Sequence, residues 1–143
     1  MSTSALAAPS LATDTTGLLS TSLSTLIARA PLSLPPDASI QMGAQAMRDA
    51  GVSSVLLMQG PHLHGIVTDR DLRNRVVAQG LSPALPLQHI ASTDLLCLPP
   101  QASALDALAL MAQHNIHHVP VVDKERVLGI VTPRNVDARQ SPS

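Results

Sequence analysis

The order of apolar and polar positions predicts the same series of elements in each half of the chain. Each half starts with a short apolar segment ending at two prolines, followed by a segment of helix length and two apolar runs of strand length. A strand does not continue through paired prolines, because proline lacks the N–H that a sheet requires. We therefore expect the order β-α-β-β-α twice, in an α/β fold. The expected strands cover 32–34, 55–58 and 63–67, then 95–98, 119–122 and 127–131.

The two halves are related by an offset of 64 residues without a gap. Leu34-Pro35-Pro36 returns as Leu98-Pro99-Pro100, and Gly65-Ile66-Val67-Thr68 returns as Gly129-Ile130-Val131-Thr132. Such a repeat indicates two copies of one supersecondary unit, each with an apolar face that the other can cover. A ligand site is expected in the cleft between the copies, where equivalent loops meet.

Capping residues predict where the first helix of each copy begins and ends. Ser39 and Ser103 are suited to the N-cap, where a side-chain oxygen accepts from the first turn. Gly51 and Asn115 follow the expected helices, and both residue types tolerate the left-handed conformation found there. The second copy is expected to bury a helical stripe formed by Leu105, Leu108 and Ala112.

The organisation of the chain follows from the repeat and from the composition of its ends. Residues 1–24 contain six Ser, five Thr and one charged side chain, which is typical of a flexible segment, with a short helix expected near 17–26. The repeats are expected at 25–80 and 81–137, and a flexible tail at 138–143. The second copy stops before completing a helix like the one expected at 69–79. This asymmetry indicates a piece of a longer polypeptide, or a chain that ends just past the repeat.

Composition narrows the classes of partner. A net charge of −1 over 143 residues gives no electrostatic reason to expect nucleic acid or an anionic membrane. The chain contains no Phe, Tyr or Trp, so it has no aromatic platform on which bases could stack. Its single cysteine, Cys97, excludes an internal disulfide and is expected to be buried and inert. With no secretory signal and no apolar run of about 18 residues, a cytoplasmic location is expected.

The segment 65–71 carries the candidate chemistry, because an apolar strand runs directly into a helix start. Thr68 falls at the N-cap and Asp71 at the third helical position, and in the second copy Pro133 falls at the first helical position that proline prefers. A helix start offers unpaired N–H groups to a phosphate. Arg70 adds a positive charge, and a nearby carboxylate can accept from both hydroxyls of a ribose. The segment therefore predicts a site for a nucleoside phosphate.

A purely structural interpretation of these residues stays open. Thr68 and Asp71 also have the spacing of a capping box, in which each side chain caps the main-chain N–H of the other. The repeat favours a ligand site, because a helix cap is a local feature and does not need a second, equivalent strand-to-helix turn facing it.

These motifs resemble those of a tandem CBS-domain pair, also called a Bateman module, over residues 25–137. The resemblance is carried by two G-I-V-T-x-R-(D/N) segments and by the strand 116–123. It implies two repeats packed with pseudo-twofold symmetry, and two composite clefts between them. It also implies an adenosine-containing ligand such as AMP, ADP or ATP.

The resemblance also implies a set of site residues for each cleft. In the first, Thr68 and Asp71 would hold phosphate and ribose, and Arg70 could reach the phosphate. The remaining first-cleft residues would be Ile66, Leu95, Leu96 and Ile116 around the adenine, and His117 and His118 near the phosphates. The second cleft would use Ile130, Thr132, Arg134 and Asn135 against Val52, Ser53 and Ser54. Because Asn135 stands where the first copy has a carboxylate, we expect tighter binding in the first cleft.

The leading hypothesis is a regulatory, ligand-sensing homodimer that acts on an attached or partner effector. The sequence around 69–73 and 114–118 also resembles that of bacterial modules that join a cyclic-nucleotide-binding domain to a nucleotidyltransferase domain. A nucleotidyltransferase-like effector is therefore one expectation. The alternative is a structural dimerisation module without a physiological ligand. Catalysis, an enzyme cofactor and a metal are not expected. The chain has neither a nucleophile elbow nor a P-loop, and its histidines at 114, 117 and 118 should diverge.

Overall fold

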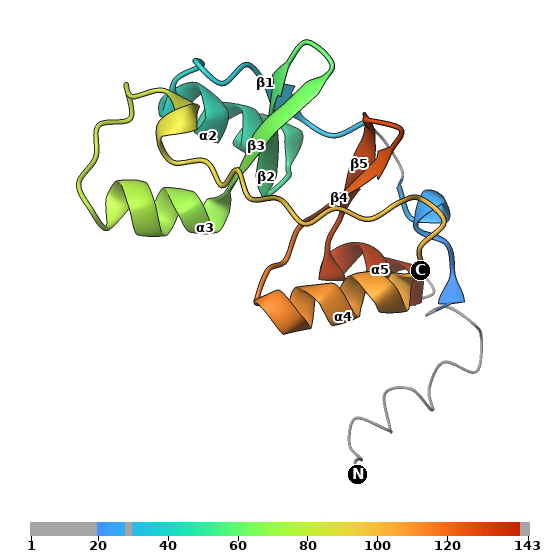
Figure 1. The fold of residues 1–143 in the computed structure, drawn as a ribbon. Coiled ribbons are helices and arrows are strands. Elements are labelled where there is room, and N and C mark those ends of the chain that lie inside the picture. The colour runs from blue at the N-terminus through green and yellow to red at the C-terminus, as the bar shows by residue number, and fades with distance from the viewer. Residues whose placement is uncertain (1–19, 28–29, 141–143) are drawn as a thin grey trace.

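The computed structural model describes residues 20–27 and 30–140, which form two repeats of similar fold (Figure 1). The first repeat contains β1 (Ser33–Leu34), α2 (Ile40–Ala50), β2 (Ser54–Gln59), β3 (His62–Thr68) and α3 (Asp69–Asp71), which continues as a π-helix over Leu72–Val77. The second contains α4 (Ala104–His114), β4 (Val119–Asp123), β5 (Arg126–Val131) and α5 (Pro133–Gln140). The predicted α/β fold with two repeats is confirmed, and the order β-α-β-β-α is complete in the first repeat.

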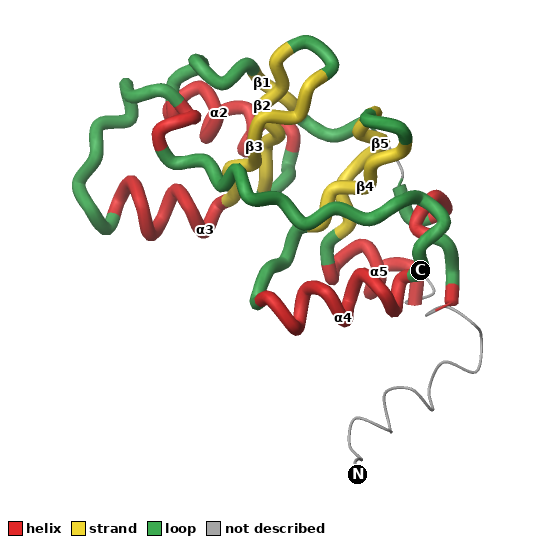
Figure 2. The backbone as a smooth tube through the Cα atoms, viewed as in Figure 1, coloured by secondary structure: helices red, strands yellow, loops and turns green. Residues whose placement is uncertain are grey.

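The strands form two small sheets that lie next to each other (Figure 2). In the first sheet, β1 pairs parallel to β2, and β2 pairs antiparallel to β3. The second sheet is the β4–β5 hairpin. Both hairpins carry a register shift at equivalent positions, after Leu57 and after Val121. The two repeats therefore share this backbone irregularity as well as their sequence pattern.

One predicted strand is not formed. Instead of a strand at 95–98, the structure has a single parallel bridge between Leu98 and Val121. Leu98 N–H donates to Pro120 O at 3.0 Å, and Val122 N–H donates to Leu98 O at 2.9 Å. The pairing ends there because Pro99 and Pro100 follow with no N–H to donate. The segment before Leu98 instead lies beside a cavity, as described below.

The predicted helix caps are confirmed, but the predicted stripe is wrong. Ser39 Oγ accepts from Met42 N–H at 3.0 Å, and Ser103 Oγ accepts from Asp106 N–H at 3.1 Å. The helices end at Gly51 (φ 68°) and Asn115 (φ 52°) in the left-handed region. On α4, Leu105 and Ala112 are exposed and Leu108 is half-buried. The buried stripe is displaced by one residue, to Ala104, Ala107 and Met111, because the small alanines face the sheet.

Each repeat is completed by the segment that precedes the other repeat. Leu23 is fully buried in the core of the second repeat, and its N–H donates to Ala102 O at 2.8 Å. Leu87 is fully buried in the core of the first repeat, and its N–H donates to Ala38 O at 2.7 Å. Both leucines lie in short 3₁₀ helices, Leu23–Thr25 and Leu87–His89. This exchange ties the two repeats together.

The expected division of the chain is therefore wrong at its ends. Residues 20–24 are not flexible, since they pack on the second repeat. Residues 1–19, including the start of the helix expected near 17–26, lie outside the described residues. At the other end, 138–140 belong to α5, and 141–143 lie outside the described residues. No helix in the part that the structure describes is long and apolar enough to cross a membrane.

Candidate functional site

Two cavities lie between the repeats. The first, called the first cleft, has a volume of about 300 Å³, and the second cleft has about 390 Å³. Both fall at the lower end of the size range of small-molecule sites. The first cleft is lined by Ile66, Thr68, Asp69, Arg70, Asp71, Arg75, Ser92, Asp94, Leu95, Leu96, Ile116, His117, His118 and Pro120. The second is lined by Leu26, Ile27, Ala30, Pro31, Leu32, Gly51, Val52, Ser53, Ser54, Ile130, Thr132, Arg134 and Asn135.

All the residues predicted for each cleft line the corresponding cavity; their roles in binding stay a prediction. Sequence reasoning missed Asp69, Arg75, Ser92, Asp94 and Pro120 in the first cleft, and Leu26, Ile27, Ala30, Pro31, Leu32 and Gly51 in the second. The offset of the repeat could have found Pro31 and Leu32, which are the equivalents of Leu95 and Leu96. No comparable signal marks Ser92.

Gly65 sets how closely the segment 91–96, here called the linker, approaches the first cleft. Ile66 and Ser92 form a bridge in which each N–H donates to the other residue's carbonyl at 3.0 Å. A Cβ on Gly65 would lie 2.9 Å from Ser92 O, closer than such atoms approach. Glycine therefore allows the linker to lie against β3, and this brings Leu95 and Leu96 to the cavity.

The capping interpretation of Thr68 and Asp71 is confirmed. Thr68 N–H donates to Asp71 Oδ2 at 2.9 Å, and Asp71 N–H donates to Thr68 Oγ1 at 3.3 Å. The cap engages one carboxylate oxygen. The other, Oδ1, lies 3.6 Å from Arg75 Nε, in a side chain that lines the first cleft. A capping role therefore leaves one acceptor of Asp71 for other contacts.

The second copy has the same cap with different chemistry. Thr132 N–H donates to Asn135 Oδ1 at 2.8 Å, and Asn135 N–H donates to Thr132 Oγ1 at 3.3 Å. Because a main-chain N–H needs an acceptor, the amide oxygen of Asn135 faces Thr132, and its NH₂ group takes the other side. The second cleft therefore presents a donor where the first presents a carboxylate oxygen.

The charges that line the two clefts also differ. Among the described residues, the second cleft contains one charged side chain, Arg134. The first contains three carboxylates and two guanidinium groups, those of Asp69, Asp71, Asp94, Arg70 and Arg75. Only the first cleft thus combines acceptors for sugar hydroxyls with cations for a phosphate.

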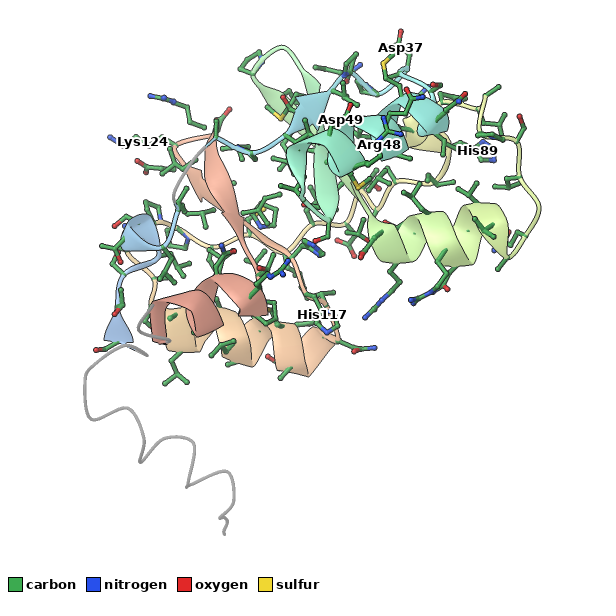
Figure 3. All side chains as sticks on the ribbon, turned by 180° about the vertical axis from the view of Figure 1, so that it is seen from behind. Asp37, Arg48, Asp49, His89, His117 and Lys124 are labelled. Atoms are coloured by element: carbon green, nitrogen blue, oxygen red, sulfur yellow. The ribbon has the colours of Figure 1, made fainter. Side chains whose placement is uncertain are left out.

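Hydrogen bonds from Arg70 and Ser53 of the first repeat hold the histidine segment of the second. Arg70 Nη1 donates to Asn115 O at 3.2 Å, and Arg70 Nη2 lies 3.3 Å from His117 Nδ1. Figure 3 shows His117 just beyond the end of α4. Ser53 Oγ and His118 Nε2 share a hydrogen bond of 2.9 Å. Burial lowers the pKa of His118, so the imidazole favours its neutral form.

Cys97 and the histidines are the remaining candidate groups. Cys97 is exposed, so the expectation of a buried thiol is wrong, because the strand expected around it is absent. Partial burial still raises the pKa of its thiol, which favours the unreactive form. Within 20–27 and 30–140, no group of three or more His, Cys, Asp or Glu side chains could hold a metal ion together.

The CBS domain family matches residues 23–78 and 87–139. The chain belongs to this family. The resemblance to a tandem CBS-domain pair is therefore confirmed. This CBS pair is 38% identical over 96 residues to the CBS domain-containing protein YhcV of Bacillus subtilis, covering 67% of this chain and 69% of that protein. It is 36% identical over 91 residues to the CBS domain-containing protein CBSCBSPB3 of Arabidopsis thaliana, covering 63% of this chain but 16% of that protein.

A solved structure shares the arrangement of this CBS pair. The CBS domain protein PAE2072 from Pyrobaculum aerophilum, in complex with AMP, is 29% identical with a TM-score of 0.75. The match covers 80% of this chain and 89% of that chain.

Proposed function

We propose that this CBS pair is a regulatory module that senses an adenosine nucleotide in the first cleft. The observation that carries the proposal is the divided role of Asp71. Its Oδ2 completes the helix cap, while its Oδ1 belongs to a carboxylate on the cavity wall that can accept from ribose hydroxyls. In the second copy the residue equivalent to Asp71 is an asparagine, which presents an NH₂ donor in place of the carboxylate oxygen. The first cleft should therefore bind the sugar more tightly.

The other walls of the first cleft suit the rest of such a ligand. Ile66, Leu95, Leu96 and Ile116 offer apolar surface for a flat base. Arg70, His117 and His118 supply groups for a phosphate, and the first two already contact each other. The AMP complex of the 29%-identical protein PAE2072 supports the same class of ligand.

A ligand in this cleft would bridge the repeats, because Thr68 and Asp71 belong to the first repeat and Ile116 to His118 belong to the second. If the ligand binds one relative arrangement of the repeats more tightly than another, binding shifts the population toward that arrangement. In a homodimer attached to an effector, this difference would be the signal. The effector domain belongs to the proposal and is expected to be nucleotidyltransferase-like.

The competing function is a structural dimerisation module, and the confirmed cap favours it, since a cap alone would explain Thr68 and Asp71. The substitution Asp71→Asn separates the two functions. Asn135 shows that asparagine makes the same cap, so Asp71→Asn should keep the fold while removing the carboxylate oxygen that a ribose needs.

Thermal melting with AMP, ADP and ATP tests the proposal. A nucleotide present at about a hundred times its Kd should stabilise the wild type by about 2.7 kcal/mol, which raises Tm by several degrees. Asp71→Asn should melt near the wild-type temperature without ligand and lose this rise. If no nucleotide raises Tm, or if Asp71→Asn responds like the wild type, the first cleft is not this sensor and the dimerisation module is favoured. Because the chain lacks Trp and Tyr, a dye or calorimetry is needed as the readout.

A further inference from the structure

The second cleft contains a buried hydroxyl group without a partner. Ser54 is 7% exposed and lines this cleft. Side chains alternate along a strand, and Val55 and Leu57 point into the core, so Ser54 points to the opposite face of β2, toward the other repeat. Within the described residues, its hydroxyl makes no hydrogen bond. Buried polar groups are nearly always paired, so this hydroxyl marks a place for a ligand or for water.

Arg134 is a second unpaired group of the same cleft. Its side chain is exposed, and its guanidinium has no hydrogen-bond or ion-pair partner in the part of the chain that is described. Its equivalent in the first repeat, Arg70, is instead engaged with Asn115 O and His117 Nδ1. Arg134 is therefore free to bind an anion in the second cleft. In the first cleft, Arg70 must first break its contacts with the second repeat.

The polar groups that this cleft can offer are mainly donors. The amide of Asn135 uses its oxygen in the cap, which leaves its NH₂ group, and Ser54 and Arg134 add O–H and N–H donors. Among the described residues that line the cleft, none is a carboxylate. Donors without carboxylates favour a phosphate group and offer no charged acceptor to a pair of ribose hydroxyls.

We infer that the second cleft binds the phosphate of a phosphomonoester with an apolar body, and that it does not select for ribose. Arg134, Ser54 and Asn135 hold the phosphate, and Ile27, Leu32 and Ile130 cover the body. The two clefts thus differ in the class of ligand rather than only in affinity. The inference rests on the proposed function in one respect, since it takes the first cleft as the site that reads the ribose.

Two probes with opposite features test this inference by NMR titration of the ¹⁵N-labelled full chain. Adenosine has the ribose hydroxyls without a phosphate, and 2′,3′-dideoxyadenosine monophosphate has the phosphate without the hydroxyls. The dideoxy probe should shift the amides of Ser54 and Arg134 in a saturable way, whereas adenosine should shift those of Ile66 and Asp71. Shifts by the dideoxy probe at the first cleft alone, or no saturable shift, would overturn the inference.

Substitutions then assign the contacts. Arg134→Gln should weaken binding of the dideoxy probe by about tenfold or more, and Ser54→Ala should weaken it measurably. The matched control Arg126→Gln removes a charge from an exposed hairpin residue that lines neither cleft, and should leave the Kd unchanged. Unchanged binding in both Arg134→Gln and Ser54→Ala contradicts the inference. If AMP fails to shift Ile66 and Asp71 while the dideoxy probe still shifts Ser54, the proposed function fails and the second-cleft inference stands.

Discussion

Ser53 and His118 share a hydrogen bond of 2.9 Å, although they line different clefts. Ser53 precedes β2 of the first repeat, and His118 precedes β4 of the second. The bond therefore joins the two cavities across the boundary between the repeats. A ligand that engages His118 in the first cleft would compete with Ser53, whose hydroxyl would then be available to the second cleft.

The lowered pKa of His118 predicts that stability falls in mild acid. The ordinary pKa of histidine is 6.5, and burial is the main cause of the lower value here. In the unfolded chain His118 takes up a proton below this pH, while the folded protein resists protonation. The free energy of unfolding should therefore decrease as the pH falls below the ordinary pKa, and the full loss is reached below the folded pKa. The charged groups facing His118 are Asp69 and Asp71, which oppose the lowering, and His117 and Arg70, which add to it.

Urea unfolding of wild type and His118→Gln between about pH 5 and 8 measures this effect. His118→Gln should show a smaller dependence of the free energy of unfolding on pH. His89→Gln, which changes an exposed histidine, is the control and should keep the wild-type dependence. Equal dependence in His118→Gln and wild type would contradict the assignment to His118.

A gain of ribose binding is expected from Asn135→Asp. Aspartate keeps the cap that Asn135 makes with Thr132, and it replaces the outward NH₂ group with a carboxylate oxygen. A hydrogen bond to a charged group contributes about 1.5–3 kcal/mol, so affinity of the second cleft for adenosine should rise by about tenfold or more. Calorimetric titration of Asn135→Asp, made in the Asp71→Asn background so that the first cleft is silent, measures it. No gain in this double variant would show that the residue at position 135 does not read the ribose.

Local sequence rules predict most of the helices and strands, and the repeat together with the family resemblance predicts part of the lining of each cleft. The strands, the caps at Ser39 and Ser103 and the turns at Gly51 and Asn115 depend on residues close in sequence, and they were predicted. The repeat identifies equivalent residues in the two halves of the chain. The family resemblance then assigns residues from both halves to each cleft. The missed strand at 95–98 shows the limit, since an apolar run next to prolines can line a cavity instead of pairing.

Contacts between distant segments could not be predicted. The helical pattern of α4 allows two adjacent stripes, and only the tertiary structure selects the one with Ala104 and Ala107. The Ser53–His118 bond depends on how the repeats meet, which no local pattern encodes. The burial of Leu23 could not be predicted, because its neighbours in sequence are Ser and Thr, which are typical of a flexible segment.

The exchanged leucines should each support the repeat that they enter. Leu23→Ala removes a fully buried side chain from the second core, and Leu87→Ala does the same in the first. Each should lower the free energy of unfolding by about 2–5 kcal/mol, because a cavity remains. Leu105→Ala, at a position that is 42% exposed, is the control and should change it by less than about 0.5 kcal/mol. Urea unfolding gives these values, and a Leu23→Ala variant as stable as Leu105→Ala would contradict the exchange.

Gly65→Ala should damage the first cleft through the linker. The new Cβ would lie 2.9 Å from the main-chain oxygen of Ser92, which cannot rotate away, so the linker must move and its bridge with Ile66 must weaken. Overpacking of this kind costs about 1–3 kcal/mol. Gly43→Ala is the matched control, because its Cβ would meet the end of the Leu87 side chain at 2.7 Å, and a side-chain end can shift. Urea unfolding should show the larger loss for Gly65→Ala, and AMP titration should show weaker binding for this variant alone. Equal losses of stability, with unchanged AMP affinity, would mean that the linker tolerates the displacement and that glycine is not needed for the shape of the cleft.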